Sequence, residues 1–321
     1  MKRIICMALC LLVLLSVFAG CGKNMNANDG KLKIVTTTFP QYDWVMNILG
    51  DKAKDADVSV LISNGIDLHS FQPSVSDISK ISECDIFIYV GGASDKWVES
   101  TVKNAENKDM IALNLMDILG KKVKEEEEIE GMEPEKEEET DEIEYDEHVW
   151  LSLNNASFFC DKIADALIKK DKKNESVYKE NLAAYKEKLG ELDGKYRDAS
   201  SSPDKKPLLF ADRFPFRYLT DDYGIEYYAA FKGCSAESEV GLNTISFLSD
   251  KIDKEKLNVV IVLEGNDKKI AKSVINNSKS KNAKILTLDS AQSVTEDDIK
   301  NGTTYIGIME KNLEVIKEAL K

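Results

Sequence analysis

Several features that would narrow the function of this chain at once are scarce or missing. The 321 residues contain only two histidines, His69 and His148, and the formal net charge is −14, so no basic excess points to a nucleic-acid partner. The three cysteines beyond the N-terminal region form an odd set without metal-type spacing, which argues against a disulfide framework. A phosphate-binding glycine loop is also lacking, since Gly91-Gly92 is a bare pair.

The N-terminus has the pattern of an export signal. A basic head precedes an apolar run over residues 4–18, which is short for a membrane span, and small residues lead into Cys21. The stretch SVFAGC resembles a bacterial lipoprotein signal, which predicts a signal peptide over residues 1–20, lipidation of Cys21 and a flexible tether over residues 21–31. A simple secretory signal is the alternative. The lipoprotein interpretation places the chain outside the cytoplasm, anchored to the outer face of the cytoplasmic membrane.

The negative charge is concentrated in one segment. Residues 125–147 contain fifteen acidic side chains and a single lysine, Lys136, so their charge of −14 equals that of the whole chain. A run of this kind repels itself and contains few apolar side chains. We therefore expect an acidic, disordered insertion over residues 121–147, whose local potential attracts cations.

Short β-rich runs alternate with helical periodicity in two series. The first covers residues 32–170 and the second covers residues 200–321, with a charged helical pattern over residues 171–199 between them. Parallel strands connected by helices form covered sheets. The pattern predicts an α/β protein with two lobes, each a parallel-sheet β/α sandwich, joined by a long rigid linking helix. The predicted strands are residues 33–38, 58–62, 85–90, 110–114, 207–211, 226–230, 257–263 and 284–288.

Both histidines and two carboxylates lie beside predicted strand ends or loops. His69, Asp212 and Asp289 follow strands, Arg213 is next to Asp212, and His148 lies where the acidic segment ends. Because ligands bind beyond the carboxyl ends of parallel strands, these side chains are expected to meet in an interlobe cleft. Imidazole and carboxylate are ligands of Zn²⁺ or Mn²⁺. The alternatives are helix caps for the two aspartates and a core position for His148.

Four stretches carry a family resemblance: GIDLHSFQPS, DEHVWLSLNNA, FPFRYLTDDYGI and ILTLDS. They resemble, in this order, the substrate-binding lipoproteins of metal-ion ABC transporters of the zinc and manganese type, and the likeness extends from about Leu32 to the C-terminus. The resemblance implies two α/β lobes joined by a rigid helix, with the ion in the cleft. It also implies capture of a divalent ion, without catalysis, and its delivery to a permease and its ATPase.

The resemblance assigns roles to particular residues. His69 and His148 match the first two metal ligands, and Asp289 matches the carboxylate ligand of the C-terminal lobe. The remaining ligand, histidine or glutamate in the family, is replaced by Arg213, whose guanidinium has no lone pair for a metal. Arg213 must therefore point away, pair with an acid or mark a changed site, and Asp212 or a water could supply the missing ligand.

Two other classes of protein are consistent with parts of the sequence. A secreted zinc hydrolase would use the two histidines and one carboxylate, but the chain contains no H-E-x-x-H motif. A surface adhesin of the same fold with altered cargo would use the acidic segment as its working part. The sequence leaves the identity of the metal open.

Overall fold

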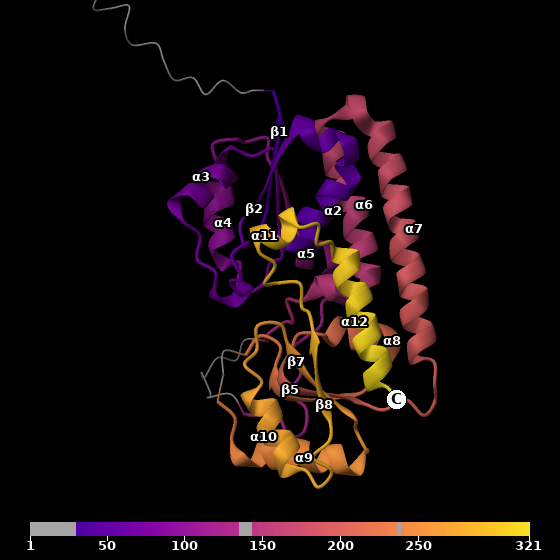
Figure 1. Ribbon diagram of the computed structural model, residues 1–321. Coiled ribbons are helices and arrows are strands. Elements are labelled where there is room, and N and C mark those ends of the chain that lie inside the picture. The colour runs from indigo at the N-terminus through magenta and orange to yellow at the C-terminus, as the bar shows by residue number, and fades with distance from the viewer. Residues whose placement is uncertain (1–29, 135–142, 236–238) are drawn as a thin grey trace, which may run out of the picture. The chain divides into compact units, whose positions relative to one another are not determined.

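Figure 1 shows the computed structural model, which describes residues 30–134, 143–235 and 239–321. Residues 32–321 form one compact unit. The expected signal peptide and Cys21 lie outside the described residues. Within the described ranges, no helix combines the length and the apolar character needed to cross a membrane.

The N-terminal lobe contains a four-stranded parallel sheet in the order β2-β1-β3-β4. Figure 1 shows α3 and α4 on one side of this sheet and α2, α5 and α6 on the other. Buried Ile, Val and Phe side chains fill β1 and β3, as is typical of a strand covered on both faces. The bounds are β1 Leu32–Thr36, α2 Phe39–Leu49, β2 Ala56–Val60, α3 Val75–Glu83, β3 Ile86–Tyr89, α4 Lys96–Lys103, β4 Ile111–Asn114, α5 Leu115–Leu119 and α6 Leu153–Lys170.

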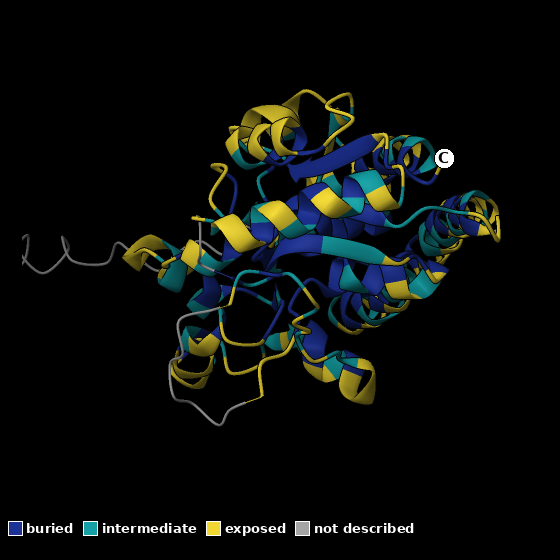
Figure 2. Cartoon of the chain, turned by 90° about the horizontal axis from the view of Figure 1, so that it is seen from below, coloured by how far each residue is buried: buried dark blue, intermediate teal, exposed yellow. Residues whose placement is uncertain are grey.

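The C-terminal lobe repeats this arrangement, with a parallel sheet in the order β6-β5-β7-β8. Successive residues of β5 point to opposite faces: Leu209 and Ala211 join the core under α9 and α10, whereas Phe210 joins a core that continues into the N-terminal lobe. Figure 2 shows the strands as buried and the outer faces of the helices as exposed. The bounds are β5 Leu208–Phe214, α8 Arg217–Tyr223, β6 Tyr227–Lys232, α9 Leu242–Lys254, β7 Val259–Leu263, α10 Lys269–Asn277, β8 Lys284–Leu288, α11 Glu296–Lys300 and α12 Tyr305–Ala319.

Helix α7 (Glu175–Ser200) runs between the lobes, and the C-terminal helix α12 lies beside it (Figure 1). A stripe of Tyr185, Leu189, Leu192 and Tyr196 along α7 is buried, as is typical of a helix with one apolar face. The Tyr196 hydroxyl donates a hydrogen bond to the Met309 carbonyl at 2.6 Å. The two parallel-sheet lobes and the long helix confirm the expected fold, while α12 adds a second connection between the lobes.

A buried carboxylate joins three of these helices. Asp43 of α2 accepts hydrogen bonds from the Tyr185 hydroxyl of α7 at 3.1 Å and from the Tyr305 backbone N–H of α12 at 3.2 Å. Burial raises the pKa of Asp43 from 3.8 to about 6, although both hydrogen bonds act to lower it. The charged form is therefore held at a cost to stability at neutral pH.

This cost predicts a pH-dependent effect of Asp43→Asn. The folded protein binds a proton at Asp43 more tightly than the unfolded chain does. Protonation of Asp43 therefore raises the free energy of unfolding as the pH falls through about 6, and this contribution is lost at higher pH. We expect the neutral amide to raise the free energy of unfolding by up to about 3 kcal/mol at pH 8 and by about half as much at pH 5. Urea denaturation with chelator present measures both values. Exposed Asp51→Asn is the control, and an equal effect of Asp43→Asn at the two pH values would contradict the explanation.

The described parts of the acidic segment differ from the expected disordered insertion, since they are anchored on the folded lobes. An antiparallel bridge pairs Glu125 with Tyr145. Further along, the Glu133 carboxylate accepts hydrogen bonds from the Gly241 N–H at 2.7 Å and the Thr244 hydroxyl at 3.0 Å at the start of α9. Local partners thus overcome the charge repulsion at these positions. Residues 135–142 lie outside the described residues.

Candidate metal centre

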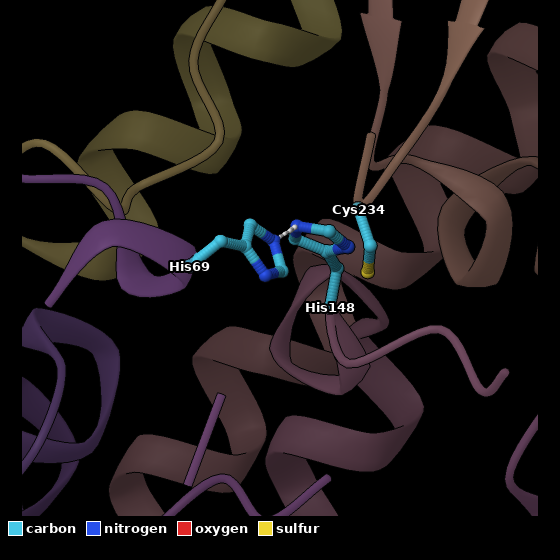
Figure 3. A group of neighbouring side chains, drawn as sticks. All are labelled: His69, His148 and Cys234. Atoms are coloured by element: carbon cyan, nitrogen blue, oxygen red, sulfur yellow. Dashed lines mark hydrogen bonds between the residues drawn. The ribbon is translucent and has the colours of Figure 1, made fainter. Parts of the chain in front are cut away.

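The two histidines of the chain meet between the lobes. His69 lies in a short 3-10 helix (Leu68–Ser70) that follows β2, and the Asp67 carboxylate caps this helix by accepting the His69 backbone N–H at 2.9 Å. His148 precedes the 3-10 helix Val149–Leu151, at the end of the acidic segment. The Nε2 atoms of the two rings are 3.3 Å apart. Figure 3 shows the two rings facing each other.

The second nitrogen of each ring has its own partner. His148 Nδ1 lies 2.9 Å from Asp146 Oδ1 and His69 Nδ1 lies 2.9 Å from Ser94 Oγ. Because an ionised carboxylate can only accept, His148 Nδ1 carries a proton and donates it. If His69 Nδ1 likewise donates to Ser94 Oγ, the neutral form of each ring directs an Nε2 lone pair toward the space between them, which is the tautomer used by metal-binding histidines.

The separation of the two Nε2 atoms fits a shared ion. Two nitrogens, each about 2.0–2.1 Å from a tetrahedral zinc ion, are about 3.3 Å apart. The observed separation is 3.3 Å. Little movement is therefore needed for both rings to bind one cation.

The surroundings of the rings favour a cation. Burial and the adjacent charge of His148 lower the pKa of His69 to about 3. Burial alone would also lower the pKa of His148, but Asp146, Glu126 and Glu147 together raise it. Three carboxylates thus lie around two rings, and their negative charge favours a cation there. Asp146 Oδ2 and Glu147 Oε2 are buried and accept no hydrogen bond.

Gly92 makes room for one of these carboxylates. Its φ is +79°, and a Cβ added there would lie 2.3 Å from Glu147 Oε1. Glu147 Oε1 accepts the Ser94 N–H at 2.9 Å, and the other oxygen lies 3.5 Å from His69 Nδ1. The glycine pair after β3, which has no phosphate-binding motif, therefore accommodates an acidic side chain beside the site.

Arg213 pairs with an acid, one of the three alternatives open from the sequence. Its Nη2 atom donates to Asp67 Oδ2 at 2.7 Å. Burial acts to raise the pKa of Asp67, but the charge of Arg213 and the hydrogen bonds from Arg213 and the His69 backbone N–H outweigh it and lower the pKa. The Arg213–Asp67 ion pair links the C-terminal lobe to the loop that holds His69.

The two predicted aspartate ligands are placed differently from the histidines. Asp212 lies inside β5, which extends beyond the predicted strand because of an irregularity in its pairing with β6. Its Oδ2 atom accepts hydrogen bonds from the Leu263 N–H at 2.8 Å and from Asn266 Nδ2 at 2.6 Å. Asp289 Oδ1 accepts the Ala291 N–H at 2.8 Å. Among the described residues, neither aspartate belongs to a group of metal-ligand atoms within 4.8 Å of either histidine.

Other potential metal ligands lie close to the two histidines. One group joins His69, His148 and Cys234, and another joins His148 with Glu126 and Asp146; within each, the ligand atoms lie within 4.8 Å of one another. Cys234, Glu126 and Asp146 are not among the site residues that the sequence predicts. Asp146 could have been noticed in the sequence, because it is an acidic residue only two positions before the predicted ligand His148. Cys234 lies in no recognisable metal-binding motif.

Comparisons with known proteins agree with this geometry. The zinc-binding lipoprotein AdcA of Streptococcus pneumoniae strain R6 is 31% identical over 319 residues, which cover 99% of this chain and 61% of the relative. The metal ABC transporter substrate-binding lipoprotein FimA of Streptococcus parasanguinis is 31% identical over 330 residues, covering 100% of this chain and 99% of FimA. The crystal structure of the Zn(II)-bound ZnuA-like domain of S. pneumoniae AdcA matches with a TM-score of 0.70 and 28% identity, over 91% of this chain and 99% of that domain.

Fold and site together define a two-lobe binding protein with an imidazole pair between its lobes. The chain belongs to the zinc-uptake complex component A periplasmic family, whose model matches residues 34–319. This confirms the resemblance noted in the sequence. The chain spans 61% of the length of the AdcA relative, whereas it matches FimA over almost the entire length of both.

Proposed function

We propose that this protein captures a divalent transition-metal ion outside the cytoplasm and delivers it to an ABC permease and its ATPase. The observation that carries the proposal is the 3.3 Å separation of the two Nε2 atoms, each ring being held through its Nδ1 atom. His69 and His148 are the proposed ligands, and the ion is cargo. Lipidation at Cys21 would anchor the protein to the membrane, as the lipoprotein names of AdcA and FimA support.

Binding explains the site better than hydrolysis does. AdcA and FimA are named as a metal-binding lipoprotein and a transporter component, not as enzymes. The zinc in the AdcA structure and the zinc-uptake description of the family support Zn²⁺ as the cargo. We keep Asp289 as a proposed ligand from the C-terminal lobe, and Asp212 as a weaker one because its carboxylate is already hydrogen-bonded.

Elemental analysis of protein purified without chelator, followed by competitive titration with Zn²⁺ and Mn²⁺, tests the proposal. We expect about one zinc ion per chain, since the structure brings the two histidines of the sequence to one place. A protein that contains no transition metal and binds neither ion in titration would refute the function.

Arg213 offers a further prediction. Its positive charge helps to lower the pKa of His69, so the same charge opposes a cation at the imidazoles. We expect Arg213→Met to tighten Zn²⁺ binding by about tenfold and Arg213→His, which also adds a nitrogen ligand, to increase the preference for Zn²⁺ over Mn²⁺. Competitive titration measures both changes. Arg197→Met on α7 is the control, and unchanged affinities in both Arg213 variants would show that the guanidinium charge does not reach the site.

A further inference from the structure

The described site leaves the ion short of protein ligands. Arg213 is paired with Asp67, and the Asp212 carboxylate accepts two hydrogen bonds from the β7 side of the sheet. We propose that Cys234 is a further protein ligand beside His69, His148 and the proposed Asp289, in place of the family ligand that Arg213 replaces. The thiolate would make the site selective for a thiophilic ion such as Zn²⁺. This inference rests on the proposed function and concerns the same site.

The geometry places the thiol beside both rings. Cys234 Sγ and one nitrogen each of His69 and His148 lie within 4.8 Å of one another, and Figure 3 shows the sulfur beside the ring of His148. A tetrahedral zinc ion with Zn–S about 2.3 Å and Zn–N about 2.0–2.1 Å requires an S···N separation of about 3.6 Å. Each S···N separation therefore has at most about 1.2 Å to close when the ion binds.

Contacts on both sides of the loop after β6 fix the position of Cys234. The Cys234 backbone N–H donates to Glu126 Oε1 at 3.0 Å, so the acidic segment fixes the residue from one side. On the other side, Gly233 lies against β5, where an added Cβ would be 2.8 Å from the Phe214 carbonyl oxygen. Glycine is therefore required for the close approach that brings the thiol to the imidazoles.

A second observation points to a cation at this place. Asp146 and Glu147 are 0% and 2% exposed, and each has one buried oxygen without a hydrogen bond. Buried carboxylate oxygens without partners are costly, and a divalent ion close by would offset that cost. When the ion binds, the Zn–S bond forms as the S–H bond of Cys234 breaks, and the proton leaves to solvent.

The chemistry of this ligand set predicts selectivity. Thiolate is a soft ligand that suits Zn²⁺, whereas Mn²⁺ prefers carboxylate, carbonyl and water oxygens. Arg213 stands where the family has a histidine or glutamate ligand. A sulfur ligand from the loop after β6 then compensates for the missing ligand. Cys84 and Cys160 are buried in the lobes and provide matched controls.

Cobalt substitution of the purified protein tests the inference directly. Wild type and Cys84→Ala loaded with Co²⁺ should both show an intense near-ultraviolet sulfur-to-cobalt charge-transfer band. Cys234→Ser should lose this band while still binding Co²⁺ through the histidines, and its Zn²⁺ affinity should fall about 100-fold with less than a tenfold change for Mn²⁺. Gly233→Ala should weaken the band and the Zn²⁺ affinity while keeping all thiols. X-ray absorption at the zinc edge of the wild type should find one sulfur at about 2.3 Å, a measurement that requires no variant.

The outcomes separate the two proposals. A wild type that binds none of Zn²⁺, Co²⁺ and Mn²⁺ refutes the metal-capture function itself. A wild type that binds both ions without a charge-transfer band or a sulfur neighbour, with unchanged affinity in Cys234→Ser, overturns the assignment of Cys234 and leaves the function in place.

Discussion

His69→Ala should lower the affinity for Zn²⁺ by more than about 100-fold, because it removes one of two imidazole ligands and leaves the other without a partner. This exceeds the loss of about 10–100-fold that follows removal of an outer partner of a ligand. The side chain of His69 is 17% exposed and lies in a loop, so we expect the fold to remain intact. Competitive titration with a zinc chelator of known affinity measures the change, and thermal denaturation checks the fold.

Ser70→Ala is the matched control, since Ser70 is the exposed neighbour of His69 in the same 3-10 helix. Its affinity should equal that of the wild type. Tight zinc binding in His69→Ala would remove His69 from the site. His148→Ala is a poorer test because His148 is completely buried and its removal would leave the Asp146 carboxylate without its Nδ1 donor.

Asp146→Asn should weaken zinc binding by about 10–100-fold without removing a proposed ligand. The Asp146 carboxylate accepts the Nδ1 proton of His148 at 2.9 Å and the His148 backbone N–H at 2.8 Å. It therefore fixes both the tautomer and the ring orientation, and its charge favours a cation. The neutral amide keeps the shape but does not enforce the tautomer.

The control for this variant removes the same charge from the same segment. Glu128 is exposed, and Glu128→Gln should change zinc affinity by less than about twofold at physiological salt, where exposed charges are screened over about 8 Å. Isothermal titration of the two variants gives the comparison. Equal, small losses in both would mean that Asp146 acts only through its contribution to the overall charge.

The sequence predicted the sheets and the imidazole pair for related reasons. Runs such as residues 85–90 and 257–263 are apolar enough to identify covered strands, and the carboxyl ends of such strands bring distant loops together. His69 and His148 lie in such loops. Cys234 follows the predicted strand 226–230 and shares this strand-end signal, but its spacing from the other cysteines matches no metal motif, so the sequence alone did not select it.

The acidic segment shows where reasoning from charge alone fails. Fifteen acidic residues predict a solvated chain, yet Asp146 and Glu147 are buried because His148, Ser94 and the space left by Gly92 receive them. The extent of β5 was also missed. Its irregular pairing with β6 keeps Asp212 and Arg213 within the strand, and this irregularity has no marker in the sequence.

The bridge between Glu125 and Tyr145 holds the two ends of the acidic segment together, so the chain between them can change in length without disturbing the neighbouring metal site. Hydrogen bonds from the Glu126 N–H to the Glu144 carbonyl and from the Asp146 N–H to the Lys124 carbonyl, both 2.9 Å long, hold the two ends of the segment together. Each doubling of the chain between them adds only about 0.6 kcal/mol of closure entropy. A fluorescent reporter domain inserted between Pro134 and Ile143 would therefore leave Glu126 and Asp146 in register while its attachment point stays a few residues from His148. The same fold could in this way be converted into an optical sensor of its cargo.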